Sequence, residues 1–155
     1  MTSTVGSATL TVTLTEAITL NGYDQGSTNT LTIASVNEVS KRIVTATTTE
    51  QEVLAFGTAV AAGTFLEDKV VYFRITNLDD TNHVVLTFKS EGNHEFAVKL
   101  DKGQSFIYNG DLAGGVVDTM DASGSALSLA LEDLVNVTAD ADTASCDLEI
   151  FVACI

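Results

Sequence analysis

A period-two alternation of apolar and polar residues dominates this sequence. It is clearest in residues 9–15, where leucine and valine alternate with threonine. Successive side chains of a β-strand point to opposite faces, so this pattern puts the apolar side chains on one face and the threonines on the other. Threonine suits the hydrated face, because its branched Cβ fits pleated geometry while its hydroxyl stays solvated. The pattern therefore predicts a half-buried strand.

Residues 70–108 give the strongest run of strand signals. Residues 70–76 are almost continuously apolar, which favours a central strand buried on both faces. Residues 77–82 are rich in Asn and Asp, which bond their own backbone in turns, so we expect residues 70–76 and 84–88 to form a hairpin. With residues 96–100 and 105–108, these segments predict a meander of four consecutive strands.

Strand and turn signals also occur outside this run. Asn21-Gly22 and the polar residues 24–29 predict turns, while residues 134–139 and 146–154 are expected to form a closing pair. Two segments stay ambiguous. Residues 125–135 fit either a strand, which we favour, or one face of a helix. Residues 110–124 fit a segment ordered against a neighbouring subunit or one folded on its own core.

About nine short strands separated by turns predict an all-β fold, an antiparallel β-sandwich of jelly-roll-like type. A chain of 155 residues has the usual size of one domain, so we expect a single sandwich over residues 1–155. Residues 1–10 have two interpretations, an N-terminal arm exchanged with a neighbour or simply the first strand.

Composition excludes several classes of protein. Hydrophobic residues make up 45% of the chain and charged residues 18%, enough apolar surface to offset the entropy lost on folding. No uninterrupted apolar run approaches the ~20 residues of a membrane-spanning helix. A net charge of −14 repels phosphate backbones and anionic lipids, so neither nucleic acid nor a membrane is an expected partner.

Cysteine usage and the N-terminus indicate the folding compartment. Cys146 and Cys154 lie on one predicted strand about 26 Å apart, far beyond the reach of a disulfide of about 7 Å. Two free thiols fit a reducing cytoplasm. Residues 1–6 contain no basic residue followed by an apolar stretch, so no secretory signal is expected either.

Residues that could carry chemistry are few. His83 and His94 lie in or beside predicted turns, away from any G-x-S-x-G motif, and are interpreted as surface residues. Glycoside hydrolysis needs a pair of carboxylates, and the chain has several acidic pairs, but it lacks the aromatic platforms of a sugar-binding cleft. The acidic pairs are Asp79-Asp80, Glu132-Asp133 and Asp140 with Asp142. Residues 77–82 lack EF-hand spacing and favour a tight turn over a calcium loop. We expect no catalytic, cofactor-binding or metal-binding residue, and no enzyme.

One resemblance extends these predictions. Residues 70–77 (VVYFRITN), 84–88 (VVLTF) and 96–106 (FAVKLDKGQSF) resemble segments of small virion proteins of tailed bacteriophages, especially marine phages. The closing residues 147–153 are also similar, whereas the first sixty residues share only a threonine-rich composition. The resemblance implies a structural component of the virion, made in the host cytoplasm.

The resemblance further implies a capsid decoration or cement protein, or a minor head or tail component, bound to the major capsid protein or other virion proteins. A decoration role implies a homo-oligomer, commonly a trimer, with strand edges or arms covered by neighbours. The alternative is a receptor- or glycan-binding sandwich of the tail-tip or adhesin type, which would need a concave site with exposed aromatic residues or bound calcium.

Overall fold

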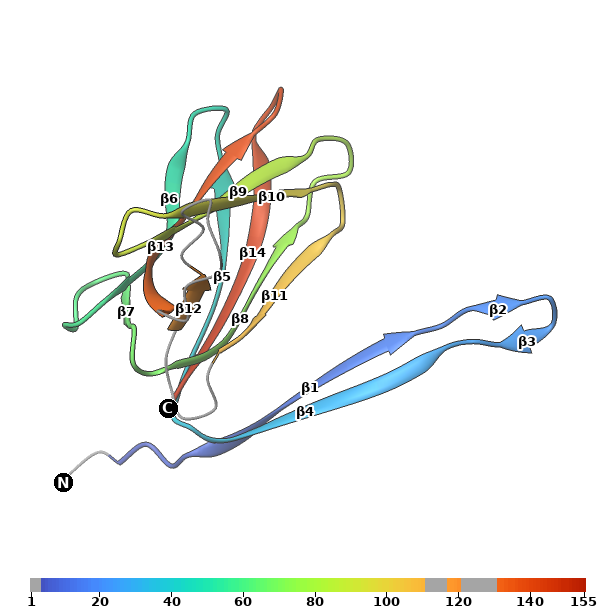
Figure 1. Ribbon diagram of the computed structural model, residues 1–155, viewed down its shortest axis with the longest axis horizontal. Coiled ribbons are helices and arrows are strands. Elements are labelled where there is room, and N and C mark those ends of the chain that lie inside the picture. Colours follow the sequence, from blue (N-terminus) through green and yellow to red (C-terminus); the bar gives the residue numbers. More distant parts are fainter. Residues whose placement is uncertain (1–3, 111–116, 121–130) are drawn as a thin grey trace. The chain divides into compact units, whose positions relative to one another are not determined.

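The computed structural model describes residues 4–110, 117–120 and 131–155, and this part of the chain is all-β. The chain folds as two compact units, Met1–Asn37 and Glu38–Ile155, whereas the sequence predicted one domain over residues 1–155 with residues 1–10 as an optional arm. The first unit is a β-hairpin and the second a β-sandwich (Figure 1). Among the described residues, no helix has the length and apolar character needed to cross a membrane.

The sandwich consists of two sheets. One sheet has the strand order β11-β8-β14-β5, and the other has the order β10-β9-β13-β6-β7, with β12 pairing to β13. The described pairs are antiparallel except for the parallel edge pair of β6 and β7. The strands are β5 (Glu38–Ala46), β6 (Gln51–Gly57), β7 (Thr64–Leu66), β8 (Val70–Asn77), β9 (Val84–Ser90), β10 (Glu95–Leu100), β11 (Ser105–Asn109), β12 (Val117–Met120), β13 (Leu131–Ala141) and β14 (Cys146–Cys154).

The strand pairs of the sandwich are nested along the chain. β9 pairs with β10, and the strands flanking this hairpin, β8 and β11, pair with each other in the opposite sheet. Further out, β6 pairs with β13 and β5 pairs with β14. Successive pairs alternate between the two sheets, so the chain resembles a long hairpin rolled into a sandwich. The predicted antiparallel β-sandwich is therefore confirmed.

One core holds the two sheets together. Phe73 of β8 is fully buried, and its ring lies 5.7 Å from Phe56 of β6 and 6.5 Å from Phe88 of β9, both in the opposite sheet. Tyr108 of the neighbouring β11 stacks on Phe73 at 4.7 Å. The predicted burial of residues 70–76 on both faces is confirmed for residues 70–73, all of which are buried. These aromatic contacts link both layers around one residue, which makes Phe73 a central determinant of packing.

Three predicted pairings are wrong. β8 and β9 do not form a hairpin, because residues 78–83 carry the chain from one sheet to the other. The four-stranded meander is therefore also wrong, since β9 and β10 pair in one sheet while β8 and β11 pair in the other. The closing strands β13 and β14 likewise lie in different sheets. Alternation reports which face of a strand is buried, but in a sandwich the same pattern suits a partner in either sheet.

The ambiguous segments fall partly outside the described residues. Residues 131–135 belong to strand β13, in agreement with the favoured interpretation, whereas residues 125–130 are not among those described. Within residues 110–124, only Gly110 and β12 are described, so neither interpretation of that segment is tested.

Candidate functional site

The N-terminal unit is a β-hairpin whose described strands pair with one another and with no strand of the sandwich. Strand β1 (Ala8–Glu16) pairs antiparallel with β4 (Ser27–Val36), and the short strands β2 (Thr19–Leu20) and β3 (Tyr23–Asp24) continue the ribbon to its tip. We call residues 8–36 the arm.

The local sequence explains both ends of the arm. At the tip, Asn21 and Gly22 have φ angles of 52° and 83°, and two successive positive values are the requirement of a type I′ turn, which Asn-Gly meets better than other dipeptides. At the base, Ala34 and Ser35 together oppose Thr9 in a bulge, and Ser35 has a φ of 64°. The tight turn fixes the register of the whole ribbon.

The register sorts the arm into two faces. Leu10 opposes Ile33 and Val12 opposes Leu31, so apolar residues share one face, while Thr11, Thr13 and Thr15 oppose threonines on the other. On the threonine face, the hydroxyls of Thr15 and Thr28 lie 3.3 Å apart. The predicted half-buried strand over residues 9–15 is confirmed in its extended conformation, although Leu14 on the apolar face is 48% exposed.

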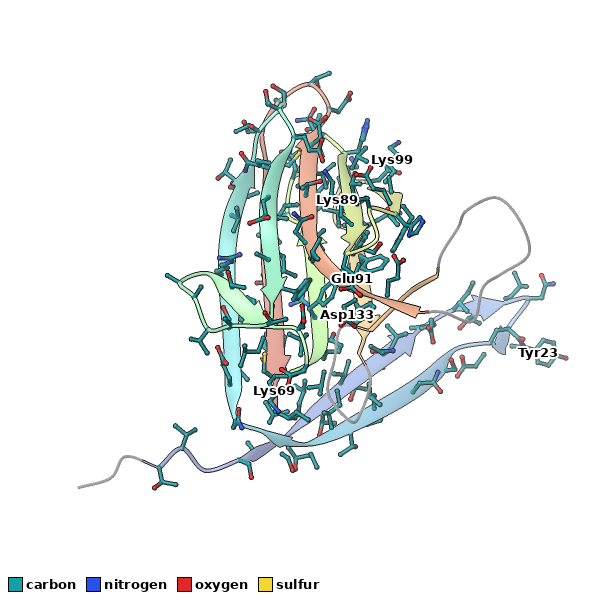
Figure 2. All side chains as sticks on the ribbon, turned by 60° about the vertical axis from the view of Figure 1, so that its left-hand side comes forward. Tyr23, Lys69, Lys89, Glu91, Lys99 and Asp133 are labelled. Carbon is teal, nitrogen blue, oxygen red and sulfur yellow. The ribbon has the colours of Figure 1, made fainter. Side chains whose placement is uncertain are left out.

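Large apolar side chains gather toward the exposed tip. Ile18 is 55% exposed, Leu20 is 60% exposed and Tyr23 is 72% exposed. Leu20 and Tyr23 are cross-strand partners, so their side chains lie on the same face of the ribbon. Figure 2 shows Tyr23 at the end of the hairpin, with its ring directed away from the strands. An apolar cluster of this kind, exposed on a thin ribbon, is typical of a surface that a partner covers.

The arm is almost free of charge. Glu16 and Asp24 are the only charged side chains in residues 1–37, and all seven basic residues of the chain lie in residues 38–155. Even these two carboxylates bond within the arm, since Glu16 accepts a 2.8 Å hydrogen bond from the Ser27 hydroxyl and Asp24 accepts one of 2.8 Å from the Gly26 amide. Charged residues make up about a quarter to a third of a solvated surface. The arm therefore has the composition of an interface, where charge is depleted.

The two histidines lie at opposite ends of β9. His83 precedes this strand and His94 follows it, so the strand's seven residues put about 23 Å between them. Nδ1 of His83 lies 3.5 Å from a carboxylate oxygen of Asp142, and Nδ1 of His94 lies 2.8 Å from Glu132. The structure does not bring the histidines together. Within the described ranges, no group of three or more His, Cys, Asp or Glu side chains could hold a metal ion.

His94 belongs to a polar cluster that ties the β9–β10 turn to β13. The Ser90 hydroxyl donates a 2.5 Å hydrogen bond to the Glu132 Oε2 atom that His94 also contacts, and the His94 amide donates to the Ser90 hydroxyl at 3.1 Å. The bond from His94, with those from Ser90 and the Gly92 amide, lowers the pKa of Glu132 below its usual value. Ser90 is only 3% exposed and its hydroxyl donates its hydrogen bond to the carboxylate, so the cluster anchors the turn.

The remaining acidic pairs that the sequence singled out, and the carboxylates near them, lie in turns, close to like charges or exposed on a strand. Asp79 accepts hydrogen bonds from the Thr81 and Asn82 amides at 2.8 Å and 2.5 Å, and these bonds lower its pKa. Residues 77–82 therefore form the predicted tight turn. Glu67 lies near Asp133 and Glu91, and burial, followed by these like charges, raises its pKa. Asp133 and Glu91 lie together in Figure 2. Asp140 lies exposed on β13.

Both cysteines lie in strand β14 as free, buried thiols, in agreement with the prediction. Burial raises the pKa of Cys154 to about 12 and also raises that of Cys146. A thiolate is the reactive form of cysteine, so neither side chain has the character of a nucleophile or a metal ligand.

Sequence reasoning did not identify two features that the structure shows. The first is the full length of the arm, which the even spacing of two alternating runs around Asn21-Gly22 signals. The second is Asn77, which is fully buried where the chain crosses between sheets. Its side-chain amide donates to the carbonyls of Asn82 and Leu100 at 3.0 Å and 3.3 Å, and its oxygen accepts the Asp79 amide at 3.0 Å. No sequence pattern marks a residue that joins two crossovers.

Comparisons of the chain with protein-family models, with curated proteins and with solved structures gave no match. The arm is therefore the candidate functional site on physical grounds alone. It combines an exposed apolar tip, a near absence of charge and a regular two-stranded ribbon, which are the features expected of a surface that binds another macromolecule.

Proposed function

We propose that this chain is a non-enzymatic virion structural protein of a tailed bacteriophage, a capsid decoration or cement protein that binds the outer shell as an oligomer. The observation that carries the proposal is the arm, which presents large apolar side chains from 48% to 72% exposed on a ribbon with two charged residues. Exposed apolar surfaces of this kind mark sites that a binding partner covers.

The stability of the arm gives a second argument. An isolated two-stranded ribbon is marginally stable in water, because its single pair of strands buries too little apolar surface. A protein that keeps such a ribbon with an optimal tip turn gains from it through assembly. Edge strands and arms covered by neighbouring subunits are a common device in symmetric particles.

The sandwich supplies a scaffold suited to this role. Its nested pairs β5/β14, β6/β13, β8/β11 and β9/β10 support a jelly-roll-like arrangement, and jelly rolls are used by capsid and lectin domains alike. Architecture alone does not decide between those uses. The resemblance of residues 70–108 to small phage virion proteins favours the capsid role. The excess of acidic residues over residues 38–155 suits the face that stays in water.

Quantitative peptide mass spectrometry on purified particles of the phage that encodes the chain tests this proposal. Copies near one per major capsid protein, or a simple fraction such as one third, are expected of a shell decoration protein. A few copies per particle would overturn the decoration role in favour of the portal or tail. Complete absence would refute the virion role altogether.

Binding to shells depleted of the chain tests the arm directly. The Leu20→Ser/Tyr23→Ser variant removes two exposed apolar side chains, and we expect its shell binding to weaken at least about tenfold. Val60→Ser is the matched control, because Val60 is an exposed apolar residue of the sandwich unit, 85% exposed in a loop. Equal binding by both variants would refute the role of the arm.

A further inference from the structure

Strand β1 forms one edge of the arm. Among the described strands it pairs with β4 alone, so the backbone groups on its other side have no strand beside them (Figure 1). The amide of Gln25 donates a 2.9 Å hydrogen bond to the carbonyl of Ile18, which makes these two residues a hydrogen-bonded pair of the ribbon. Such pairs alternate with non-hydrogen-bonded pairs along an antiparallel ribbon, so Val12 and Leu31, three alternations further toward the base, are hydrogen-bonded too.

The odd-numbered residues of β1 direct their backbone groups away from β4. Since Val12 and its even-numbered neighbours bond to β4, the N–H and C=O groups of Thr11, Thr13 and Thr15 point out of the ribbon. We call the backbone groups of these three threonines the β1 edge. Their side chains are exposed as well. An unpaired edge of this kind is a template for another strand unless something blocks it.

The β1 edge lacks the features that usually block an exposed edge, which are lysine, proline, bulges and short length. The nine residues of β1 contain one charged side chain, Glu16 at the end of the strand, and no glycine or proline. The opposite edge of the ribbon is less regular, because β4 contains the bulge at Ala34 and Ser35. The end strands of the two sandwich sheets are short or charged: β7 and β11 have three and five residues, while β5 and β10 each carry a lysine and a glutamate.

We infer that the β1 edge of one copy of this chain pairs antiparallel with the β1 edge of a second copy, so that two arms form one four-stranded sheet in the order β4-β1-β1-β4. The inference rests on the proposed function, in which the chain acts as an oligomer, and it names the contact that forms the oligomer. Because the contact has a two-fold axis, it gives a dimer rather than the trimer expected of a decoration protein.

The sequence of β1 is complementary to itself. In the register that overlaps all nine residues, Val12 faces Val12 of the second copy, and Leu10 faces Leu14. Thr11 then faces Thr13, so the outward-pointing backbone groups of the two strands meet and form about eight hydrogen bonds. Apolar side chains oppose apolar ones and threonines oppose threonines. The alternation of β1 is symmetric about Val12, which is the condition for a strand to pair with itself in this way.

The charge of the chain permits this contact. Each copy carries a net charge of −14, so two copies meet most easily through segments that contribute little to that charge. Glu16 already accepts a hydrogen bond from Ser27. In the paired strands the two Glu16 residues lie at opposite ends, about 27 Å apart, which is about three times the Debye length of about 8 Å at physiological ionic strength.

The marginal stability of a two-stranded ribbon favours the same contact. Three or more strands with an apolar face are needed for a sheet to be stable by itself. Pairing through β1 converts two ribbons into one four-stranded sheet. Its apolar face brings together Leu10, Val12 and Leu14 of both copies, and Leu14 is 48% exposed in a single copy. The dimer contact therefore also stabilises the arm that presents the apolar tip.

Proline substitutions on the two edges of the ribbon test the inference. Thr13 and Thr30 are cross-strand partners in a non-hydrogen-bonded pair, so their amides point out of opposite edges. Thr13→Pro removes a donor from the β1 edge and no bond of the ribbon, and Thr30→Pro is the matched control on β4. In sedimentation velocity of the full chain, we expect dimers for the wild type and for Thr30→Pro. Thr13→Pro should associate at least about tenfold more weakly, because the two-fold axis doubles the loss of hydrogen bonds.

Disulfide formation at the two-fold axis gives an independent readout. In the register described, the two Val12 residues form a non-hydrogen-bonded pair with Cα atoms about 4.5 Å apart, within the reach of a disulfide. Val12→Cys is therefore expected to give a covalent dimer on a non-reducing gel after mild oxidation. Leu14→Cys is the matched control, because the two Leu14 residues lie about 14 Å apart in the dimer. The wild type, whose two thiols are buried, supplies the blank.

Four outcomes would overturn the inference. They are a wild-type trimer, weaker association of Thr30→Pro than of Thr13→Pro, cross-linking of Leu14→Cys as fast as that of Val12→Cys, and a monomeric wild type. A monomeric wild type that is nevertheless abundant in virions would leave the decoration role intact. A dimer linked through Val12→Cys, from a chain that is absent from virions, would support the contact and refute the virion role.

Discussion

The buried amide of Asn77 should be among the most sensitive polar positions of the sandwich. It lies where β8 leaves one sheet, and it bonds both to its own turn, at Asn82 and Asp79, and to Leu100, at the end of β10. Asn77→Ala removes three hydrogen bonds and leaves the buried carbonyl of Leu100 without its side-chain donor. A net loss of about 1 kcal/mol per bond, with an added cost for a buried unpaired group, gives about 3–4 kcal/mol.

Urea denaturation followed by far-UV circular dichroism measures this loss, and the tyrosines supply a second probe because the chain has no tryptophan. In a thermal scan the same change corresponds to a fall of about 10 °C in Tm. Asn82→Ala is the control, since the Asn82 side chain bonds to exposed groups, accepting from the Thr143 hydroxyl and bonding the Asp79 carboxylate. The control should lose about 1 kcal/mol or less, because exposed hydrogen bonds are replaced by bonds to water.

The isosteric variant Asn77→Asp separates hydrogen bonding from packing. It replaces the donor group with an oxygen that faces the carbonyls of Asn82 and Leu100, so at pH 7 it should destabilise at least as much as Asn77→Ala. Burial favours the neutral acid, which raises the folded-state pKa of the new carboxyl above its unfolded value, so the deficit should shrink as the pH falls toward 4. A loss for Asn77→Ala equal to that for Asn82→Ala would refute this account.

Three further predictions concern the core, the thiols and the turn anchor. Phe73→Ala should cost about 3–5 kcal/mol in urea denaturation, and Phe96→Ala less than half as much, because Phe73 is fully buried while Phe96 is 44% exposed; equal losses would contradict the packing argument. Cys146 and Cys154 are buried, so a thiol-reactive chromogenic disulfide at pH 8 should react with neither in the native protein and with both in urea; rapid native reaction would contradict their burial. The lowered pKa of Glu132 stabilises the fold above about pH 4.5, and this contribution is lost as the pH falls through the folded-state pKa, so Glu132→Gln should be less stable than the wild type at pH 7 and closer to it at pH 3; a stability difference that does not change with pH would contradict the pairing with His94 and Ser90.

The strands could be predicted from the sequence, but their partners could not. Alternation and apolar runs located β1, β8 and β9, because each strand's own side chains decide which face is buried. The pairing of β8 with β11 across twenty-seven intervening residues depends on which sheet each strand joins, and both sheets demand the same alternation. Turn-rich residues 77–82 are as suitable for a crossover between sheets as for a hairpin.

The candidate site was only partly predictable for a related reason. The sequence allowed residues 1–10 to be an arm, but the hairpin that forms the proposed binding surface runs to the tip at Leu20 and Tyr23. The signal was a depletion of charge, since the first 37 residues contain two charged residues. Such a depletion is harder to recognise in a sequence than a motif. The cluster of Ser90, His94 and Glu132 joins residues far apart in sequence, so no spacing rule could reveal it.

The arm and the sandwich differ in how their stability arises, and this separates the effects of mutations. Residues 38–155 hold a core shared by two sheets, whereas a two-stranded ribbon alone opens at little cost in free energy. Binding of the arm to a partner must therefore supply the energy that orders it, which lowers the affinity gained per unit of buried area. It follows that a core change such as Phe73→Ala should reduce the amount of folded protein without changing the affinity of each folded molecule. A change at Leu20 or Tyr23 should reduce the affinity of each folded molecule without changing the amount of folded protein.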